Sequence, residues 1–148
     1  MPTPLGPLTI EDRDGMLSAL YFGDCNDRNE TPLLHAAVRQ LADYFATRRH
    51  DFDLPLAPAA TPFQARLRHA MCAIPFGETR SYAELARDLA SAPRAVGQGC
   101  GRNPLPIIVP CHRVVAATGR LGGFSAGDGP ATKQRLLAHE SAAFALRV

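Results

Sequence analysis

Residues 102–115 read RNPLPIIVPCHRVV, and this stretch decides how the second half of the chain is organised. The apolar run 107–109 lies between prolines and predicts a buried strand, because short apolar runs bounded by turn formers are typical of core strands. A Cys-His-Arg triplet, 111–113, follows directly and precedes a second β-like run at 114–115. The cysteine is therefore expected at the end of a buried strand.

Cys111 and His112 carry the chemistry of this stretch. A thiol with an ordinary pKa of about 8.5 is only slightly ionised at neutral pH, so a nucleophilic cysteine needs a basic or positively charged neighbour. Adjacent side chains on an extended backbone point to opposite faces, so His112 reaches Cys111 only where the chain turns or a water bridges them. Pro110 favours such a turn. On these two residues alone, a structural pair and a catalytic pair both stay open.

The preceding segment predicts two short helices joined by a tight turn. Ser81 and Glu84 have capping-box spacing, and a second helix start follows at 91–93. This helix-turn-helix outline indicates DNA binding, although many other proteins share it. Glycines at 97, 99 and 101 each disfavour the second helix by about 1 kcal/mol relative to alanine. Either they let the helix lie close to another backbone, such as the walls of a minor groove, or the helix ends near Gly97.

A last helix is predicted over residues 131–144, with Leu136, Leu137 and Phe144 at helical spacing. Glu140 falls on the same face. A buried carboxylate commonly orients an imidazole, so Glu140 is a candidate partner for His112. The alternative is a glutamate at the solvent-exposed rim.

The first 56 residues predict a separate strand-and-helix region. Asp14 and Gly15 form a turn signal between two β-like runs, which predicts a hairpin, and residues 32–45 have the apolar spacing of a helix. The proline-rich segment 53–62 indicates a domain boundary. Thr61 and Pro62 then supply the start of the next helix.

Composition narrows the class of protein. The 148 residues carry a formal charge of +2, with −4 in residues 1–56 and +6 in residues 57–148, and 15 of the 16 basic residues are arginine. The basic half is a mild indication of nucleic-acid binding. The sequence shows neither a membrane span nor a signal peptide, so a cytoplasmic protein associated with the nucleoid through DNA is expected. Cys25, Cys72 and Cys100 are expected to be buried small residues rather than zinc ligands, and no metal site is predicted.

Residues 61–140 resemble the O6-alkylguanine-DNA alkyltransferases, which repair DNA by direct reversal. The core of the match is RNPLPIIVPCHRVV. TRSYAELA (79–86) and PRAVGQGCGRNP (93–104) resemble the helix-turn-helix of the family, and GGFSAG (122–127) with KQRLLAHE (133–140) resembles its substrate loop and last helix. The first 60 residues match more loosely, with a first strand that is short or absent.

The resemblance implies an α+β fold. A small N-terminal strand-and-helix domain would occupy 1–56, and a helical domain with a helix-turn-helix and a short strand pair carrying the cysteine would occupy 61–148. The implied partner is double-stranded DNA containing O6-alkylguanine, approached through the minor groove. We expect no cofactor and a monomer, with cooperative assembly on DNA and activity on O4-alkylthymine left open.

The resemblance also assigns roles to individual residues. Cys111 would accept the alkyl group irreversibly, activated by Glu140 and by His112 acting through a water. Arg94 would replace the flipped nucleotide in the duplex, and Asn103 would brace the turn before the cysteine. The remaining assignments are to the DNA-binding helices and the base pocket. Tyr82 would help rotate the phosphate and protonate the departing guanine. Contact with DNA would be made by Ser81, Ala95 and Gly97. The Val114 backbone would read the guanine amino group, and Phe124 and Ser125 would close over the base.

Phe124 departs from the tyrosine that many relatives have, and this puts only fine substrate preference in doubt. Three other functions are weighed against repair. An alkyltransferase-like recognition module would have tryptophan in place of Cys111, and the chain has no tryptophan. A Cys-His hydrolase would need an oxyanion hole that the sequence does not show. A DNA-binding alkylation sensor would need additional domains for which the chain is too short.

Overall fold

The computed structural model describes residues 1–25, 29–116 and 120–143, with side chains through residue 141, and divides the chain into two compact units, Met1–Ala57 and Pro58–Val148. Among the helices that the structure describes, none combines the length and apolar character needed to cross a bilayer. Phe144, which we expected in the last helix, lies outside the described residues.

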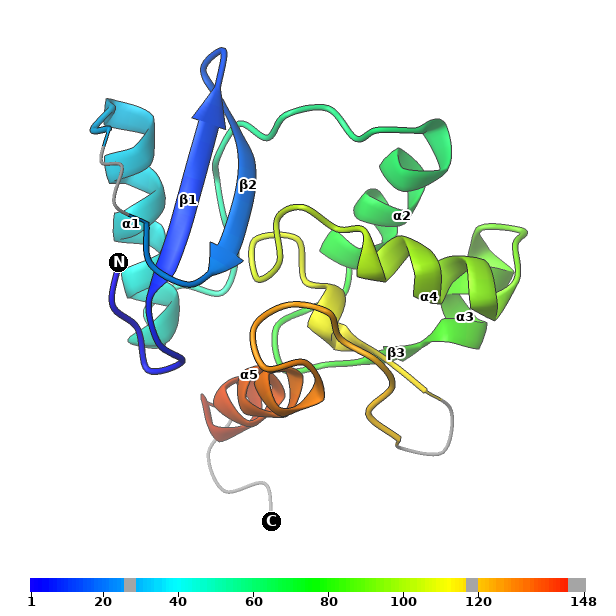
Figure 1. The fold of residues 1–148 in the computed structure, drawn as a ribbon. Helices are drawn as coiled ribbons and strands as arrows, with labels where there is room; N and C mark the ends of the chain where they lie inside the picture. The colour runs from blue at the N-terminus through cyan, green and yellow to red at the C-terminus, as the bar shows by residue number, and fades with distance from the viewer. Residues whose placement is uncertain (26–28, 117–119, 144–148) are drawn as a thin grey trace. The chain divides into compact units, whose positions relative to one another are not determined.

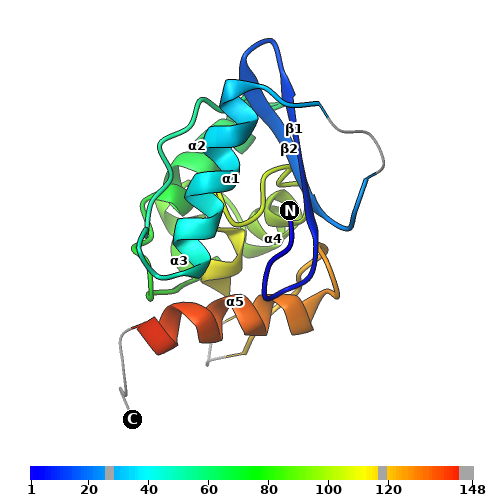
Figure 2. The ribbon, with the colours of Figure 1, turned by 90° about the vertical axis from the view of Figure 1, so that its left-hand side faces the viewer.

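The first unit is a β-hairpin with one helix along it (Figures 1 and 2). Strands β1 (Leu8–Arg13) and β2 (Met16–Phe22) pair antiparallel, and a third segment joins β2 through a bridge from Leu17 to Leu56. Asp14 and Gly15 both have positive φ, 52° and 77°, as a two-residue type I′ turn requires. The hairpin prediction is therefore confirmed.

Helix α1 (Pro32–Phe45) begins where the sequence pattern predicts. Thr31 caps it by accepting a hydrogen bond from the Leu34 amide, and its own hydroxyl donates to Asp12 of β1 at 2.8 Å. Ala37, Leu41 and Tyr44 lie on the buried face at helical spacing. The helix buries this face against the hairpin.

The second unit contains the predicted helix-turn-helix. Helix α2 (Pro62–Cys72) is capped by Thr61, and α3 (Tyr82–Asp88) begins with the full capping box of Ser81 and Glu84. Helix α4 (Pro93–Gly101) packs against α3 and α2. It continues past Gly97, so the alternative in which the helix ends near that residue is excluded.

The three glycines of α4 differ in their surroundings. A methyl group added at Gly99 would run into Leu67 and Gln64 of α2, whereas one at Gly97 would only touch the Tyr82 ring and one at Gly101 would meet nothing within 4 Å. The close approach that Gly99 permits is therefore to another helix of the same unit.

The prediction of a strand at 107–109 is wrong. These residues form a turn with one bridge, Pro106 to Val109, and Ile107 has a positive φ of 74°. The prolines at 104, 106 and 110 lack the amide donors that a strand needs. In addition, the Asn103 side chain donates a 2.9 Å hydrogen bond to the Val109 carbonyl. The segment is nevertheless buried.

Four further elements complete the unit. Strands β3 (Arg80–Ser81) and β4 (Val114–Val115) form a short parallel pair, and the single 3₁₀ turn η1 (Cys111–Arg113) precedes β4. Helix α5 (Pro130–Ala143) packs against η1 (Figure 1). This contact brings the last helix to the cysteine and histidine of η1.

The glycines give a matched test of the packing in this unit. Gly99→Ala should lower the free energy of unfolding by about 1 to 3 kcal/mol, because the added methyl group overpacks the contact with α2. Gly101→Ala should change it by less than about 1 kcal/mol, since that position is open. Guanidinium unfolding of both variants measures the difference. Equal effects would contradict the assignment of Gly99 to the helix–helix contact.

Candidate active site

Pro110 turns the chain so that Cys111 and His112 leave the extended conformation. Its φ of −81° and ψ of 66°, with a 2.8 Å hydrogen bond from the Cys111 amide to the Val109 carbonyl, form an inverse γ-turn. The two side chains then lie on successive positions of η1 rather than on a strand. Cys111 lines a cavity, while His112 lies behind it, fully buried against Glu140.

Glu140 is the centre of a buried hydrogen-bond network. His112 Nε2 lies 2.7 Å from one carboxylate oxygen, and Arg113 donates to both oxygens, at 2.9 and 3.0 Å. Arg113 also donates to the Ile74 carbonyl at 2.7 Å, and the Gly77 amide lies 3.4 Å from Glu140. Glu140 is 1% exposed, so the rim alternative is excluded. Arg113 is thus an internal ion-pair partner of Glu140.

The network sets the protonation of its members. Burial alone would raise the pKa of Glu140, but the hydrogen bonds and charges of His112 and Arg113 hold it well below its usual range. Burial lowers the pKa of His112 despite the nearby carboxylate, so the imidazole is neutral at neutral pH. Because Nε2 faces an ionised carboxylate, it carries the ring proton. His112 Nδ1 is thus an acceptor, and it has no hydrogen-bond partner among the described residues.

The cavity in front of Cys111 has a volume of about 690 Å³ and an apolar, concave wall built from α3, α4, η1 and the loop before α5. Most of the site residues predicted from the sequence line it. These are Tyr82, Arg94, Gly97, Asn103, Cys111, Phe124 and Ser125. Ser81, Ala95 and Val114 do not line it: Ser81 caps α3, Ala95 is half-buried on α4, and Val114 is buried on β4.

Asn103 links the end of α4 to the segment that carries the cysteine. Its amide donates to the Val109 carbonyl at 2.9 Å, and its side-chain oxygen accepts from the Leu105 amide at 3.0 Å. Burial raises the pKa of the Cys111 thiol, while a hydrogen bond from Asn103 and the positive charge of Lys133 act in the opposite direction. Asn103 therefore acts on both the backbone and the thiol.

Lys133 is a member of the site that the sequence reasoning missed. It is 0% exposed, and its ammonium donates to the Val114 carbonyl at 2.6 Å and to the Tyr82 hydroxyl and the Gly123 carbonyl at 3.2 Å. Lys133, Leu136 and Glu140 have the spacing i, i+3 and i+7, which places all three on one helix face. This spacing was the sequence signal that could have identified Lys133 as a site residue.

The other cysteines do not behave alike. Cys25 and Cys72 are exposed, so the prediction that they are buried is wrong for both. Met71 takes the buried position on α2, and the next residue is turned about 100° away toward solvent. Cys100 is half-buried, lines the cavity and lies 3.8 Å from the Met71 sulfur. Within the described ranges, no three His, Cys, Asp or Glu side chains are placed to bind a metal ion.

Glu140→Gln tests the buried network. It should lower the free energy of unfolding at pH 7 by about 3 to 5 kcal/mol, because Arg113 is left as an uncompensated buried charge. The folded-state pKa of Glu140 is depressed, so its contribution is complete above the ordinary value of 4.5 and is lost as the pH falls below it. The difference in free energy of unfolding between wild type and variant should therefore become smaller in acid.

Chemical unfolding at neutral and acid pH measures this difference. Glu84→Gln is the matched control, since glutamine is accepted in a capping box and the side chain is exposed, and its effect should stay within about 0.5 kcal/mol. A Glu140→Gln protein as stable as this control would contradict the network.

Two protein-family models together match nearly the whole chain. The DNA binding domain of 6-O-methylguanine DNA methyltransferase matches residues 62–142, and the ribonuclease-like domain of the same family matches residues 1–58. Two similar proteins carry the name methylated-DNA-protein-cysteine methyltransferase. That of Mycolicibacterium paratuberculosis is 43% identical over 93% of this chain and 88% of its own, and the constitutive protein of Bacillus subtilis is 41% identical over 83% and 82%.

A solved structure agrees with these matches. The crystal structure of Mycobacterium tuberculosis OGT in complex with DNA superposes with a TM-score of 0.84, at 38% identity, covering 97% of this chain and 92% of the other. The α+β architecture, with an N-terminal ribonuclease-like domain and a helical DNA-binding domain, is therefore confirmed. The chain belongs to the 6-O-methylguanine DNA methyltransferase family.

Proposed function

We propose that Cys111 takes a methyl or larger alkyl group from O6 of guanine in DNA and keeps it as a thioether, so that each molecule acts once. The observation that carries the proposal is the position of the Cys111 thiol on the wall of the 690 Å³ cavity, with the His112–Glu140–Arg113 network directly behind it. A cavity with room for a base beside a helix-turn-helix suits a nucleotide that has been turned out of a duplex.

His112 activates the thiol. Its Nδ1 is an acceptor with no partner among the described residues, and it receives the Cys111 proton through a water. Glu140 holds the ring in this tautomer, and Arg113 keeps Glu140 ionised. Asn103 acts on the thiol directly through its hydrogen bond.

The transfer itself is a displacement at carbon. The Cys111 sulfur forms a bond to the alkyl carbon, and the bond from that carbon to O6 breaks, leaving its electron pair on guanine. Tyr82 donates its hydroxyl proton to the departing base. Tyr82 is suited to hold this proton until then, because burial raises the pKa of its hydroxyl.

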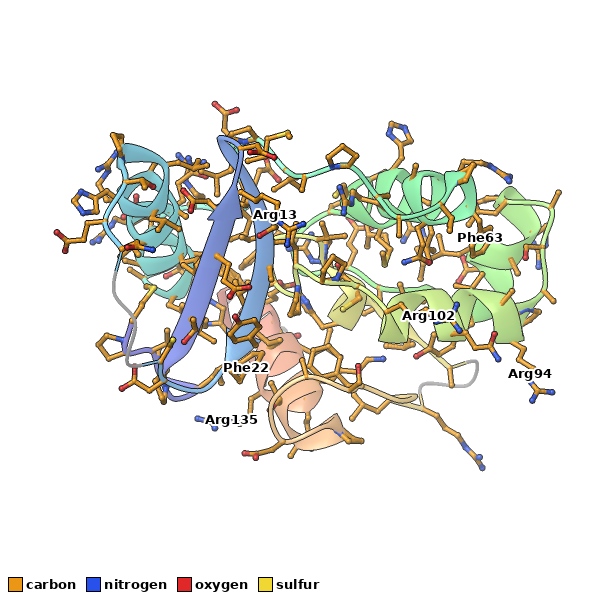
Figure 3. The ribbon with its side chains drawn as sticks, turned by 45° about the horizontal axis from the view of Figure 1, so that its top comes forward. Arg13, Phe22, Phe63, Arg94, Arg102 and Arg135 are labelled. Carbon is orange, nitrogen blue, oxygen red and sulfur yellow. The ribbon has the colours of Figure 1, made fainter. Side chains whose placement is uncertain are left out.

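DNA binds along the helix-turn-helix. Ser81, Tyr82, Arg94, Ala95 and Gly97 lie at the start of α3 and on the first turns of α4, and Arg94 extends away from α4 into solvent (Figure 3). A guanidinium in this position can fill the space of an extruded nucleotide. The charge of +6 in residues 57–148 adds affinity for any sequence, and the Mycobacterium tuberculosis relative has been crystallised with DNA.

The loop before α5 closes over the base. Phe124 supplies an apolar wall, and Ser125, whose hydroxyl donates to the Gly101 carbonyl at 3.1 Å, links the loop to the end of α4. The resemblance to the family assigns the reading of the guanine amino group to the Val114 backbone; here Val114 is buried outside the cavity lining, and its carbonyl accepts a hydrogen bond from Lys133.

Incubation with a duplex containing one O6-methylguanine tests the transfer. The intact protein should gain the mass of one CH₂ group, located on Cys111 by peptide mapping, because a methyl group replaces the thiol proton. Cys111→Ser should gain nothing, whereas Cys72→Ser, which alters an exposed thiol, should react as wild type does. Tight lesion binding without a mass increase would indicate a recognition module instead.

Arg94→Ala tests the proposed intercalation. Extruding a nucleotide costs a few kcal/mol, and losing about 1.4 kcal/mol of compensation slows transfer from duplex DNA about tenfold. The rate with free O6-methylguanine base should stay the same, since nothing is extruded. Arg102→Ala, at the other end of α4 (Figure 3), should weaken only the salt-dependent affinity. An equal loss on duplex and free base would contradict the role of Arg94.

A further inference from the structure

Lys133 places a positive charge in the interior of the second unit. Its side chain is 0% exposed, and its three hydrogen bonds go to two carbonyls and one phenol, all neutral. The ion pairs recorded among the described residues do not include it. A buried ammonium without a carboxylate partner is costly, so a group able to become an anion nearby would stabilise it.

The ammonium lies behind the wall of the cavity that Cys111 lines. Tyr82 and Gly123, two of its three acceptors, line that cavity, and the Tyr82 ring centroid lies 5.4 Å from its nitrogen. The ionisable groups around it come from four elements. They are Tyr82 of α3, Cys100 of α4, Cys111 and His112 with Arg113 of η1, and Glu140 on α5 itself.

Only one of these groups is suited to become its anionic partner. Burial raises the pKa of Tyr82, and burial raises that of Cys100 to about 12, so both stay neutral at neutral pH. Glu140 is already bound through both oxygens by Arg113. Burial raises the pKa of Cys111 too, but Cys111 is distinguished because a hydrogen bond from Asn103 and the charge of Lys133 both favour its thiolate, whereas at Cys100 only the charge of Lys133 does so.

His112 is a poor counter-ion for the same thiolate. It is 0% exposed, and an imidazolium there would be a third buried cation beside a carboxylate that Arg113 already neutralises. The charges of Arg113 and Lys133 both lower the pKa of His112, in addition to its burial. Protonated His112 is therefore a brief state in the passage of the proton.

Resting on the proposed function, we propose that the Lys133 ammonium is the counter-ion of the Cys111 thiolate, and that His112 relays the thiol proton to solvent without keeping it. When sulfur bonds to the alkyl carbon and the carbon–O6 bond breaks, the negative charge passes to guanine. Tyr82 protonates guanine and becomes a phenolate 3.2 Å from the same ammonium. One fixed cation thus stabilises the anion before and after transfer.

The pH dependence of alkylation by iodoacetamide tests this without DNA. Tryptic cleavage after Arg102 and Arg113 places Cys111 and Cys100 in different peptides, so the modification of Cys111 is followed alone. Lys133→Gln removes the charge but keeps a hydrogen-bond donor, and should raise the apparent pKa of Cys111 by about 1 to 3. An unchanged pKa would overturn the proposal.

Two further variants separate charge from structure. Tyr82→Phe removes a partner of Lys133 while keeping the ammonium, so the pKa of Cys111 should stay near that of wild type. His112→Gln should leave the apparent pKa of Cys111 unchanged, because the thiolate does not depend on an imidazolium as its counter-ion. If the apparent pKa of Cys111 rises as much in Tyr82→Phe as in Lys133→Gln, Lys133 has only a structural role. If that pKa rises in His112→Gln alone, the imidazole is the counter-ion.

The wild-type protein provides a test that does not depend on the folding of a variant. Lys133 is the only lysine in the sequence, so its side-chain carbon gives a single lysine signal in NMR. The pKa of Lys133 should fall once Cys111 has been carbamidomethylated, because its anionic partner is gone; an unchanged pKa would overturn the proposal. Normal iodoacetamide profiles in a protein that takes no methyl group from DNA would count against the proposed function alone.

Discussion

The carboxylate of Glu140 is the interaction on which the candidate site depends. It receives hydrogen bonds from His112 and Arg113 of η1 and from the Gly77 amide in the segment before β3, and Arg113 extends the network to the carbonyl of Ile74, two residues beyond α2. One buried anion thus joins α5 to η1 and to the segment between α2 and β3, which are far apart in the chain. Because the side chains of His112, Arg113 and Glu140 are all buried, removing Arg113 or Glu140 would leave the other charge uncompensated.

Helix α5 brings two opposite charges to the same face. Lys133 and Glu140 are seven residues apart, which is about two turns, so both point toward η1 and β4. The Glu140 carboxylate acts on the thiol through His112, the proton acceptor, whereas the Lys133 ammonium acts on the thiolate through its charge. A short helix can therefore set the electrostatics of a nucleophile that it does not itself carry.

Local signals predicted the fold where neighbouring residues decide the structure. The Asp14-Gly15 turn, the Thr61 cap and the Ser81 capping box all formed as expected. Prediction failed where distant contacts decide. Three similar glycines on α4 differ because only Gly99 lies too close to another helix to accept a methyl group. The prediction for the apolar run at 107–109 failed for a nearer reason, because the prolines at 104, 106 and 110 lack amide donors and Asn103 donates a hydrogen bond to the Val109 carbonyl. Lys133 escaped notice because its partners lie 10, 19 and 51 residues away.

The identity of the buried cation carries its own argument. The chain uses arginine at 15 of its 16 basic positions, yet the cation behind the cavity is its single lysine. The acceptors at this point converge from α3, β4 and the loop before α5, which suits an ammonium with three donors on one nitrogen, whereas a guanidinium directs five donors within a plane. Arg113 shows the opposite case, because the two oxygens of Glu140 match a planar fork. The arrangement of acceptors, more than charge alone, therefore decides which cation the interior accepts at each point.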